Sequence, residues 1–215
     1  MIVLKRLDDA LRDGDHIRAV IRNTGVGQDG KTSGILMPSR SAQQSLIRSV
    51  YQKAGLDPRD TTYIEAHGTG TATGDQEEIA AIQSVFGAKE AEAPLHIGSI
   101  KPNIGHLESA SGIAGLIKGI LILEHGVIPP TVNLEGLKSN LSLDDTRFKV
   151  GCSALDHYRS KFTFARYQLR LSHLLGAPYA ASLSTASGME GQTLMPYLIR
   201  ERIIVGHLPS RMAPL

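Results

Sequence analysis

The stretch Tyr63-Ile64-Glu65-Ala66-His67-Gly68-Thr69-Gly70-Thr71 runs from a short apolar segment, typical of a buried β-strand, into a glycine-bearing loop that begins with a histidine. A second strand pattern over 95–100 is followed by the loop Lys101-Pro102-Asn103-Ile104-Gly105-His106-Leu107-Glu108 and then by a helical pattern. If both strands belong to one parallel sheet, a crossover helix brings their carboxyl ends to the same edge. The sequence therefore predicts that His67 and His106 face a common pocket.

The surrounding sequence alternates between strand and helix patterns. Strands are predicted over 2–4, 17–25, 63–66 and 95–100, and helices over 7–12, 42–54, 75–86 and 108–124. This order predicts an α/β fold. Because a strand pattern begins almost at Met1, we also expect the chain to start inside a larger domain.

Composition narrows the classes of function. The chain has 215 residues, and 23 Lys and Arg face 21 Asp and Glu without a basic run, which argues against nucleic-acid binding. The amino terminus lacks the apolar core of a signal peptide, and no apolar run is long enough to span a bilayer, so we expect a cytoplasmic protein without a membrane anchor. Cys152 is the single cysteine, which excludes an internal disulfide and offers no metal-site spacing.

The loop that begins at His67 contains glycines and threonines, which allow tight turns and close approach of a ligand and offer N–H and hydroxyl donors. Acidic side chains follow at the start of the next helix, and we predict that they cap its positive end: Asp75, Glu77 and Glu78. Spacing alone leaves open that His67 is an ordinary loop histidine that stabilises a turn.

The loop with His106 precedes a helix rich in small residues, which can pack closely against neighbouring backbone. The amino-terminal end of that helix disfavours a positive charge, so we predict a neutral His106 that donates a hydrogen bond. Lys101 and Glu108 flank the histidine and are predicted to form an ion pair that orients the loop; the alternative is a solvated surface pair.

Two neutral imidazoles that point at one place suit two kinds of chemistry. They can stabilise an oxyanion or enolate as charge develops on a thioester carbonyl. They can also bind a metal ion, with Asp75 or Glu108 as a third ligand, in a metal-assisted hydrolase. Neither acidic residue has a recognised metal-motif spacing, which makes the metal site the weaker hypothesis.

The two histidine stretches closely resemble the ketosynthase (β-ketoacyl synthase) domain of modular and iterative type I polyketide synthases. Further agreement comes from five short stretches: Val3-Leu4-Lys5-Arg6-Leu7, Asp9-Ala10-Leu11-Arg12-Asp13-Gly14-Asp15, Gln28-Asp29-Gly30-Lys31-Thr32, Gly74-Asp75 and Ile128-Pro129-Pro130-Thr131-Val132-Asn133. The resemblance covers roughly 2–149 and would correspond to the second half of such a domain.

This resemblance implies a partial thiolase-like fold, with a mixed or parallel sheet and flanking helices, in a domain that is usually dimeric. It implies condensation of an acyl chain with malonyl carried on an acyl carrier protein, as in polyketide and fatty-acid-type biosynthesis. The substrates would ride on phosphopantetheine, and the domain itself would hold no cofactor. The family's histidine roles, malonyl decarboxylation and enolate stabilisation, map onto His67 and His106. Its supporting lysine and acidic partner map onto Lys101 and Glu108, and Thr69 and Thr71 would line the pantetheine channel.

The chain departs from the family pattern in two places. The family's nucleophilic cysteine lies well before the histidine motifs, and Cys152 comes after them, so we expect Cys152 to be an inert thiol. After Val150 the family's closing Gly-Phe-Gly-Gly-Thr-Asn stretch is missing, and basic side chains outnumber acidic ones. We therefore divide the chain into 1–150, the carboxy-terminal portion of a ketosynthase, and 151–215, an unrelated tail.

Within the tail, 158–175 could form a basic amphipathic helix, and the residues after it are expected to be poorly ordered. Binding of the tail to a membrane surface is a weaker alternative. For the chain as a whole, the first hypothesis is a ketosynthase fragment that is inactive alone because it lacks the acyl-accepting cysteine. The alternative is a non-catalytic remnant or interaction module that binds a partner ketosynthase half or a carrier protein.

Overall fold

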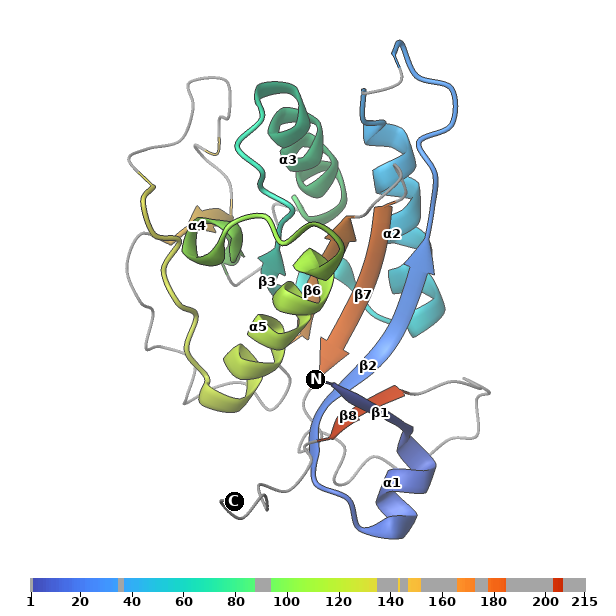
Figure 1. Ribbon diagram of the computed structural model, residues 1–215. Helices are drawn as coiled ribbons and strands as arrows, with labels where there is room; N and C mark the ends of the chain where they lie inside the picture. Colours follow the sequence, from blue (N-terminus) through green and yellow to red (C-terminus); the bar gives the residue numbers. More distant parts are fainter. Residues whose placement is uncertain are drawn as a thin grey trace.

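A computed structural model of the chain describes residues 2–34, 37–87, 94–134, 143 and 147–151, and the course of three further strands over 166–172, 178–184 and 203–206. In this part of the chain the strands form one mixed sheet with the order β1-β8-β2-β7-β6-β3-β4-β5 (Figure 1). Its strands are β1 Val3–Arg6, β2 Ile17–Val26, β3 Thr61–Glu65, β4 Leu95–Gly98, β5 Phe148–Val150, β6 Arg166–Ser172, β7 Pro178–Ser184 and β8 Ile203–Gly206.

The sheet has a parallel half and an antiparallel half. Strand β3 pairs in parallel with β4 and β6, and β4 pairs in parallel with β5. Strands β6, β7, β2, β8 and β1 pair with one another antiparallel. The expectation of an α/β fold with a mixed sheet is confirmed, and the two strands that precede the histidine loops are parallel neighbours, as the argument from the sequence requires.

Five helices and two short 3-10 turns connect the described strands. They are α1 Leu7–Asp13, α2 Arg40–Ala54, α3 Ala72–Phe86, α4 Lys101–Ile104 and α5 Ser111–His125, with 3-10 turns at Pro58–Asp60 and Glu108–Ala110. The four predicted helices lie where expected, to within a few residues. The short helix α4 was not predicted. It lies within the segment that was predicted to be the second histidine loop, and Gly105, whose φ is 77°, follows its last residue.

The two faces of the sheet carry different side chains, because neighbouring residues of a strand point to opposite sides. Ile64 and Ile97 belong to a buried apolar cluster with Tyr51 of α2 and Phe86 of α3, whose rings meet edge to face at 5.4 Å. Tyr63 and Glu65 lie on the opposite face, toward α5. Helices α2 and α3 therefore cover one side of the sheet and α5 the other (Figure 1).

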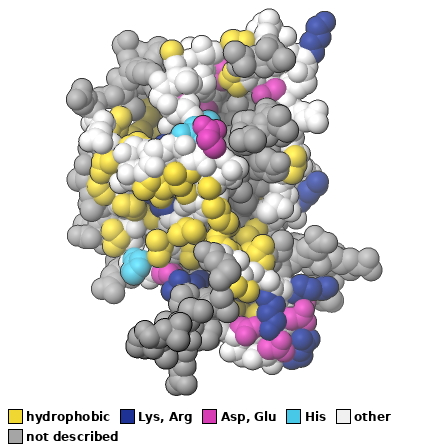
Figure 2. Space-filling view, viewed as in Figure 1, with side chains coloured by type: hydrophobic (Ala, Val, Ile, Leu, Met, Phe, Trp, Pro, Cys, Tyr) yellow, Lys and Arg dark blue, Asp and Glu magenta, His cyan; other side chains and the backbone are white. Residues whose placement is uncertain are grey.

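Helix α5 is apolar on more than one side. Ala114, Leu116, Ile120 and Ile122 are buried against the sheet side. Ile113, Ile117 and Leu121 are spaced by one helical turn and stay 37–44% exposed, which places an apolar stripe on the surface (Figure 2). An exposed stripe of this kind on a helix is typical of a surface that another polypeptide covers.

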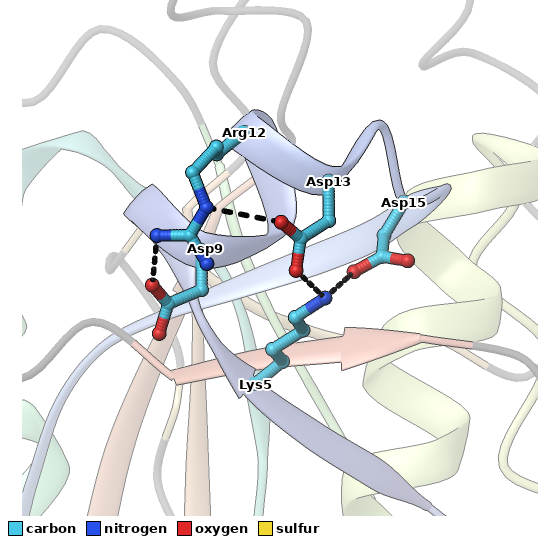
Figure 3. Close-up of polar contacts among 5 residues, drawn as sticks. All are labelled: Lys5, Asp9, Arg12, Asp13 and Asp15. Atoms are coloured by element: carbon cyan, nitrogen blue, oxygen red, sulfur yellow. Dashed lines mark hydrogen bonds and ion pairs between the residues drawn. The ribbon is translucent and has the colours of Figure 1, made fainter.

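Charged side chains connect β1, α1 and the turn that follows α1 (Figure 3). Lys5 of β1 bridges Asp13 and Asp15, and Arg12 contacts Asp9 and Asp13. These hydrogen bonds raise the pKa of Lys5 and lower that of Asp13. The groups are exposed, so solvent and salt screen the pairs, and α1 is held chiefly by the buried side chains of Leu7 and Ala10.

The helix predicted over 158–175 is wrong at 166–172, which form the central strand β6. The sequence there alternates apolar Tyr167, Leu169 and Leu171 with polar residues, a period of two, and pairing with β3 and β7 satisfies the backbone on both sides. The rest of that segment, and Cys152, lie outside the described residues. In the described part of the chain no helix has the length and apolar character needed to cross a bilayer.

Candidate active site

The two histidines meet beyond the carboxyl ends of β3 and β4. These strands pair in parallel with Glu65 opposite Gly98, so both following loops leave the sheet at one edge. The ring centroids of His67 and His106 lie 5.4 Å apart, and the rings stand at 86° to each other. The predicted convergence of the two imidazoles is confirmed.

His106 is oriented by a backbone hydrogen bond. The N–H of Glu108 donates to Nδ1 of His106 at 3.0 Å. Because Nδ1 accepts, the proton of the neutral ring lies on Nε2, which is then a hydrogen-bond donor. Glu108 reaches this position with a φ of 46°, a left-handed conformation that is uncommon for a residue other than glycine. Helix α5 begins at Ser111, later than predicted, so its amino-terminal end does not directly follow His106. The hydrogen bond from the N–H of Glu108 therefore determines which ring nitrogen carries the proton.

The loop that begins at His67 is held by a carboxylate from α3. Glu78 is 3% exposed, and its two oxygens accept hydrogen bonds from the backbone N–H groups of His67 and Gly68 at 2.9 and 3.0 Å. The prediction that Glu78 caps its own helix is therefore wrong, because α3 begins at Ala72 and leaves Glu78 in its second turn, facing back toward the loop. Glu77 instead contacts Arg40 of α2.

Lys101 joins the two loops. Its Nζ donates to the backbone carbonyl of His67 at 2.6 Å, and the hydroxyl of Ser99 donates to the same oxygen at 3.3 Å. The lysine of the second loop therefore fixes the backbone of the first histidine. The side chain of Glu108 is exposed, and its predicted ion pair with Lys101 stays a prediction.

Thr69 and Thr71 lie on the same loop, with their hydroxyl oxygens 3.2 Å apart. Thr69 is half-buried and Thr71 is exposed immediately before α3. Their predicted contact with a pantetheine arm stays a prediction.

A buried polar cluster beneath the site was not predicted. Glu65, Tyr63 and Lys118 of α5 are 2%, 1% and 6% exposed. Burial raises the pKa of Glu65, and Lys118, the Tyr63 hydroxyl and the backbone N–H of Ile100 act in the opposite direction. The sequence carried a signal for this cluster, because a lysine inside the apolar run of α5 must find a negative partner once it is buried.

A small pocket opens between the loop of His67 and α5. It is lined by Glu65, Ala66, His67, Ile100, Lys101, Ser111, Gly112 and Gly115. The small residues Gly112 and Gly115 of α5 leave this space beside the loop of His67.

The described residues contain no group of three or more His, Cys, Asp and Glu side chains arranged to hold a metal ion. The alternative in which Asp75 or Glu108 joins the two histidines as metal ligands is therefore not supported by the geometry. His67 lines the pocket and His106 is not among its lining residues, so the predicted pocket common to both histidines is not shown. The two imidazoles nevertheless lie close together and are held by backbone contacts, an arrangement that suits stabilisation of a developing negative charge.

Residues 18–135 match the family described as "Beta-ketoacyl synthase, C-terminal domain". The chain belongs to this family. It is 57% identical over 150 residues to the highly reducing polyketide synthase ltbA of Aspergillus luteorubrus and 56% identical over 150 residues to the reducing polyketide synthase PKS1 of Cochliobolus heterostrophus. These matches take in 69% and 70% of the chain but only 5% and 6% of the relatives, so the chain spans a small part of their length.

Solved ketosynthases share the fold. The ketosynthase from module 6 of the bacillaene synthase of Bacillus subtilis 168 superposes with a TM-score of 0.78 at 33% identity, over 84% of this chain and 33% of that one. The oxazolomycin ketosynthase domain OzmH KS7 of Streptomyces albus JA3453 gives a TM-score of 0.77 at 34% identity, over 85% and 32%. The chain therefore has a partial thiolase-like fold, and because 84% of it is matched, the likeness extends past residue 150. The division of the chain at Val150 stays a prediction.

Proposed function

We propose that this chain is the histidine-bearing part of a β-ketoacyl synthase that condenses acyl and malonyl thioesters with loss of carbon dioxide. The placement of the two imidazoles 5.4 Å apart, with His67 lining a pocket, is the observation that carries the proposal. Membership of the β-ketoacyl synthase family and the polyketide synthase relatives support the same chemistry.

In the proposed step, the bond between the malonyl carboxylate and the α-carbon breaks, and carbon dioxide leaves. The electron pair moves into the bond between the α-carbon and the carbonyl carbon, and negative charge develops on the thioester oxygen. The Nε2–H of His106 donates to that oxygen, and His67 polarises it from the second direction. Lys101 acts by holding the carbonyl of His67, and Glu108 acts through its backbone N–H, which orients His106.

The proposed partner is an acyl carrier protein, in the cytoplasm, whose phosphopantetheine arm brings the acyl and malonyl groups past Thr69 and Thr71. No cofactor held by this chain enters the proposed step. In the family a cysteine takes the acyl group, and the sequence places Cys152 after both histidines rather than before them. We therefore expect these 215 residues to decarboxylate malonyl slowly and to form no condensed product. A ketosynthase-type dimer is part of the proposal.

Release of carbon dioxide from malonyl on a carrier protein tests this function. The full chain should release carbon dioxide above the background rate, and His67→Ala and His106→Ala should each remove the excess. Glu77→Gln serves as the matched control, because Glu77 contacts Arg40 rather than the histidine loop. Condensed product from the chain alone, or equal rates for the wild type and both histidine variants, would contradict the proposal.

A second candidate function follows from the apolar stripe on α5. Ile113, Ile117 and Leu121 are exposed together on one side of the helix, which favours a non-catalytic interaction module that binds a complementary ketosynthase half. Size-exclusion chromatography and thermal melting test this function. A soluble monomer with one sharp melt would count against it, and association that Ile117→Glu abolishes would support it.

A further inference from the structure

The carboxylate of Glu65 lies between the two histidine loops and contacts the turn after β4 and helix α5. Glu65 is the last residue of β3, two positions before His67. Its Oε1 accepts a hydrogen bond from the backbone N–H of Ile100 at 2.6 Å, at the start of the segment that leads to His106. Its Oε2 lies 2.9 Å from Nζ of Lys118 on α5, the helix that follows His106.

The pair of Glu65 and Lys118 is enclosed by Tyr63. The hydroxyl of Tyr63 donates to Oε2 of Glu65, and Nζ of Lys118 lies 5.5 Å from the centre of the tyrosine ring. Gly98 on the neighbouring strand leaves the space for this cluster, because a Cβ at that position would lie 2.8 Å from the tyrosine oxygen and 3.4 Å from the lysine nitrogen. The position of the carboxylate is therefore fixed from several sides.

A buried ion pair of this kind adds little net stability, because the cost of removing two charges from water offsets their attraction. An apolar pair of similar volume would fill the same space at less cost. The contact that an apolar pair could not replace is the hydrogen bond from Ile100, which ties the β4–α4 turn to the end of β3.

From this geometry we infer that Glu65 is a positioning residue that sets the separation of His67 and His106, with Lys118 as its buried counter-ion. This inference rests on the proposed function, because it assigns Glu65 to the two imidazoles that act there. Glu65 works through the backbone on either side: it continues directly into the His67 loop, and it holds the turn from which the His106 loop leaves.

Two double variants of the full chain separate positioning from simple filling of space. Glu65→Gln with Lys118→Met removes both charges but keeps an amide oxygen that can accept from Ile100. Glu65→Leu with Lys118→Met removes the charges and the acceptor. We expect both variants to melt cooperatively, the leucine variant at a lower temperature because the N–H of Ile100 and the hydroxyl of Tyr63 lose their acceptor.

The deciding measurement is the nuclear Overhauser effect between ring protons of His67 and His106, which rings 5.4 Å apart should show. We expect the glutamine variant to keep this signal and the leucine variant to lose it. A leucine variant that keeps the signal would overturn the inference, and so would a glutamine variant that loses it. Loss of the cooperative melt in the leucine variant would also overturn it, because the pair would then hold the fold and not the site.

This readout does not depend on turnover. A wild-type chain that shows the ring contact but releases no carbon dioxide would contradict the proposed function and leave the positioning role intact. Where decarboxylation is measurable, the leucine variant should lose it and the glutamine variant should retain it, so rescue by the conservative substitution gives a second readout.

Discussion

The imidazole of His106 stands almost perpendicular to that of His67, at 86° and 5.4 Å, although the rings come from loops that follow different strands. Parallel pairing of β3 and β4 brings the loops to one edge of the sheet. Side chains then complete the arrangement: Glu78 holds the backbone of the first loop, and Lys101 joins the second loop to it. These polar contacts fix the loops that carry the rings, and their removal has measurable consequences.

The hydrogen bond from Glu108 to His106 predicts the tautomer of the ring. Because the backbone N–H donates to Nδ1, we expect the neutral ring of His106 to carry its proton on Nε2. Long-range nitrogen–proton correlation spectra of the full chain at alkaline pH report this directly. Glu108→Gln should leave the tautomer unchanged, since the donor belongs to the backbone. A ring protonated on Nδ1 would remove the proposed donor from the site.

Glu78→Ala should destabilise the chain. The substitution leaves two backbone N–H groups, those of His67 and Gly68, without their acceptor, and a buried unsatisfied donor costs about 1–3 kcal/mol. Urea unfolding measures the change in the free energy of unfolding. Glu77→Ala is the matched control on the same helix, and it should change far less, because its partner Arg40 is solvent-exposed. Equal losses for the two variants would show that the loop contact does not contribute.

Lys118→Met should widen the pH range over which stability falls. Burial raises the pKa of Glu65 above its ordinary value of 4.5, and Lys118 opposes that rise, so its removal raises the pKa further. Below about pH 4.5 the carboxyl is protonated in both the folded and the unfolded chain. As the pH increases, the unfolded chain releases this proton first, and stability falls until the pH passes the folded pKa.

The difference in melting temperature between the wild type and Lys118→Met should therefore widen once the pH exceeds the pKa of Glu65 in the folded wild type. Lys53→Met, an exposed position near the end of α2, controls for the loss of one positive charge. A Lys118→Met curve that runs parallel to the wild-type curve would mean that Glu65 does not respond to the lysine.

Gly98→Ala should be costly for a packing reason. The added Cβ would lie 2.8 Å from the hydroxyl oxygen of Tyr63, which a hydrogen bond to Glu65 holds in place. Overpacking of this kind costs about 1–3 kcal/mol. Gly27→Ala is the control, because the nearest atom there, on Leu46, is at an ordinary contact distance of 3.5 Å. Similar free energies of unfolding for the two variants would contradict the close fit around Tyr63.

The sequence allowed prediction of most elements and of the meeting of His67 and His106, because these follow from the local period of apolar residues and from parallel-strand geometry. It did not allow prediction of the partner of Glu78 or of Lys118, since each contact depends on how a helix docks against a loop or strand far away in the chain. Strand β6 was misread for the same reason: its alternating pattern is short, and only the neighbouring β3 and β7 decide between strand and helix.

The position of β6 and β7 leads to a test by truncation. These strands lie between β2 and β3, and β8 pairs with both β1 and β2, so residues 1–150 alone would leave β1 and β2 without their partners and would expose one edge of β3. Unpaired strand edges favour association. We expect residues 1–150 to show no cooperative melt and to aggregate. Residues 1–206, which retain all eight described strands, should melt like the full chain by circular dichroism. A monomeric, cooperatively melting 1–150 would mean that its half of the sheet folds without the central strands, and would favour the division of the chain at Val150.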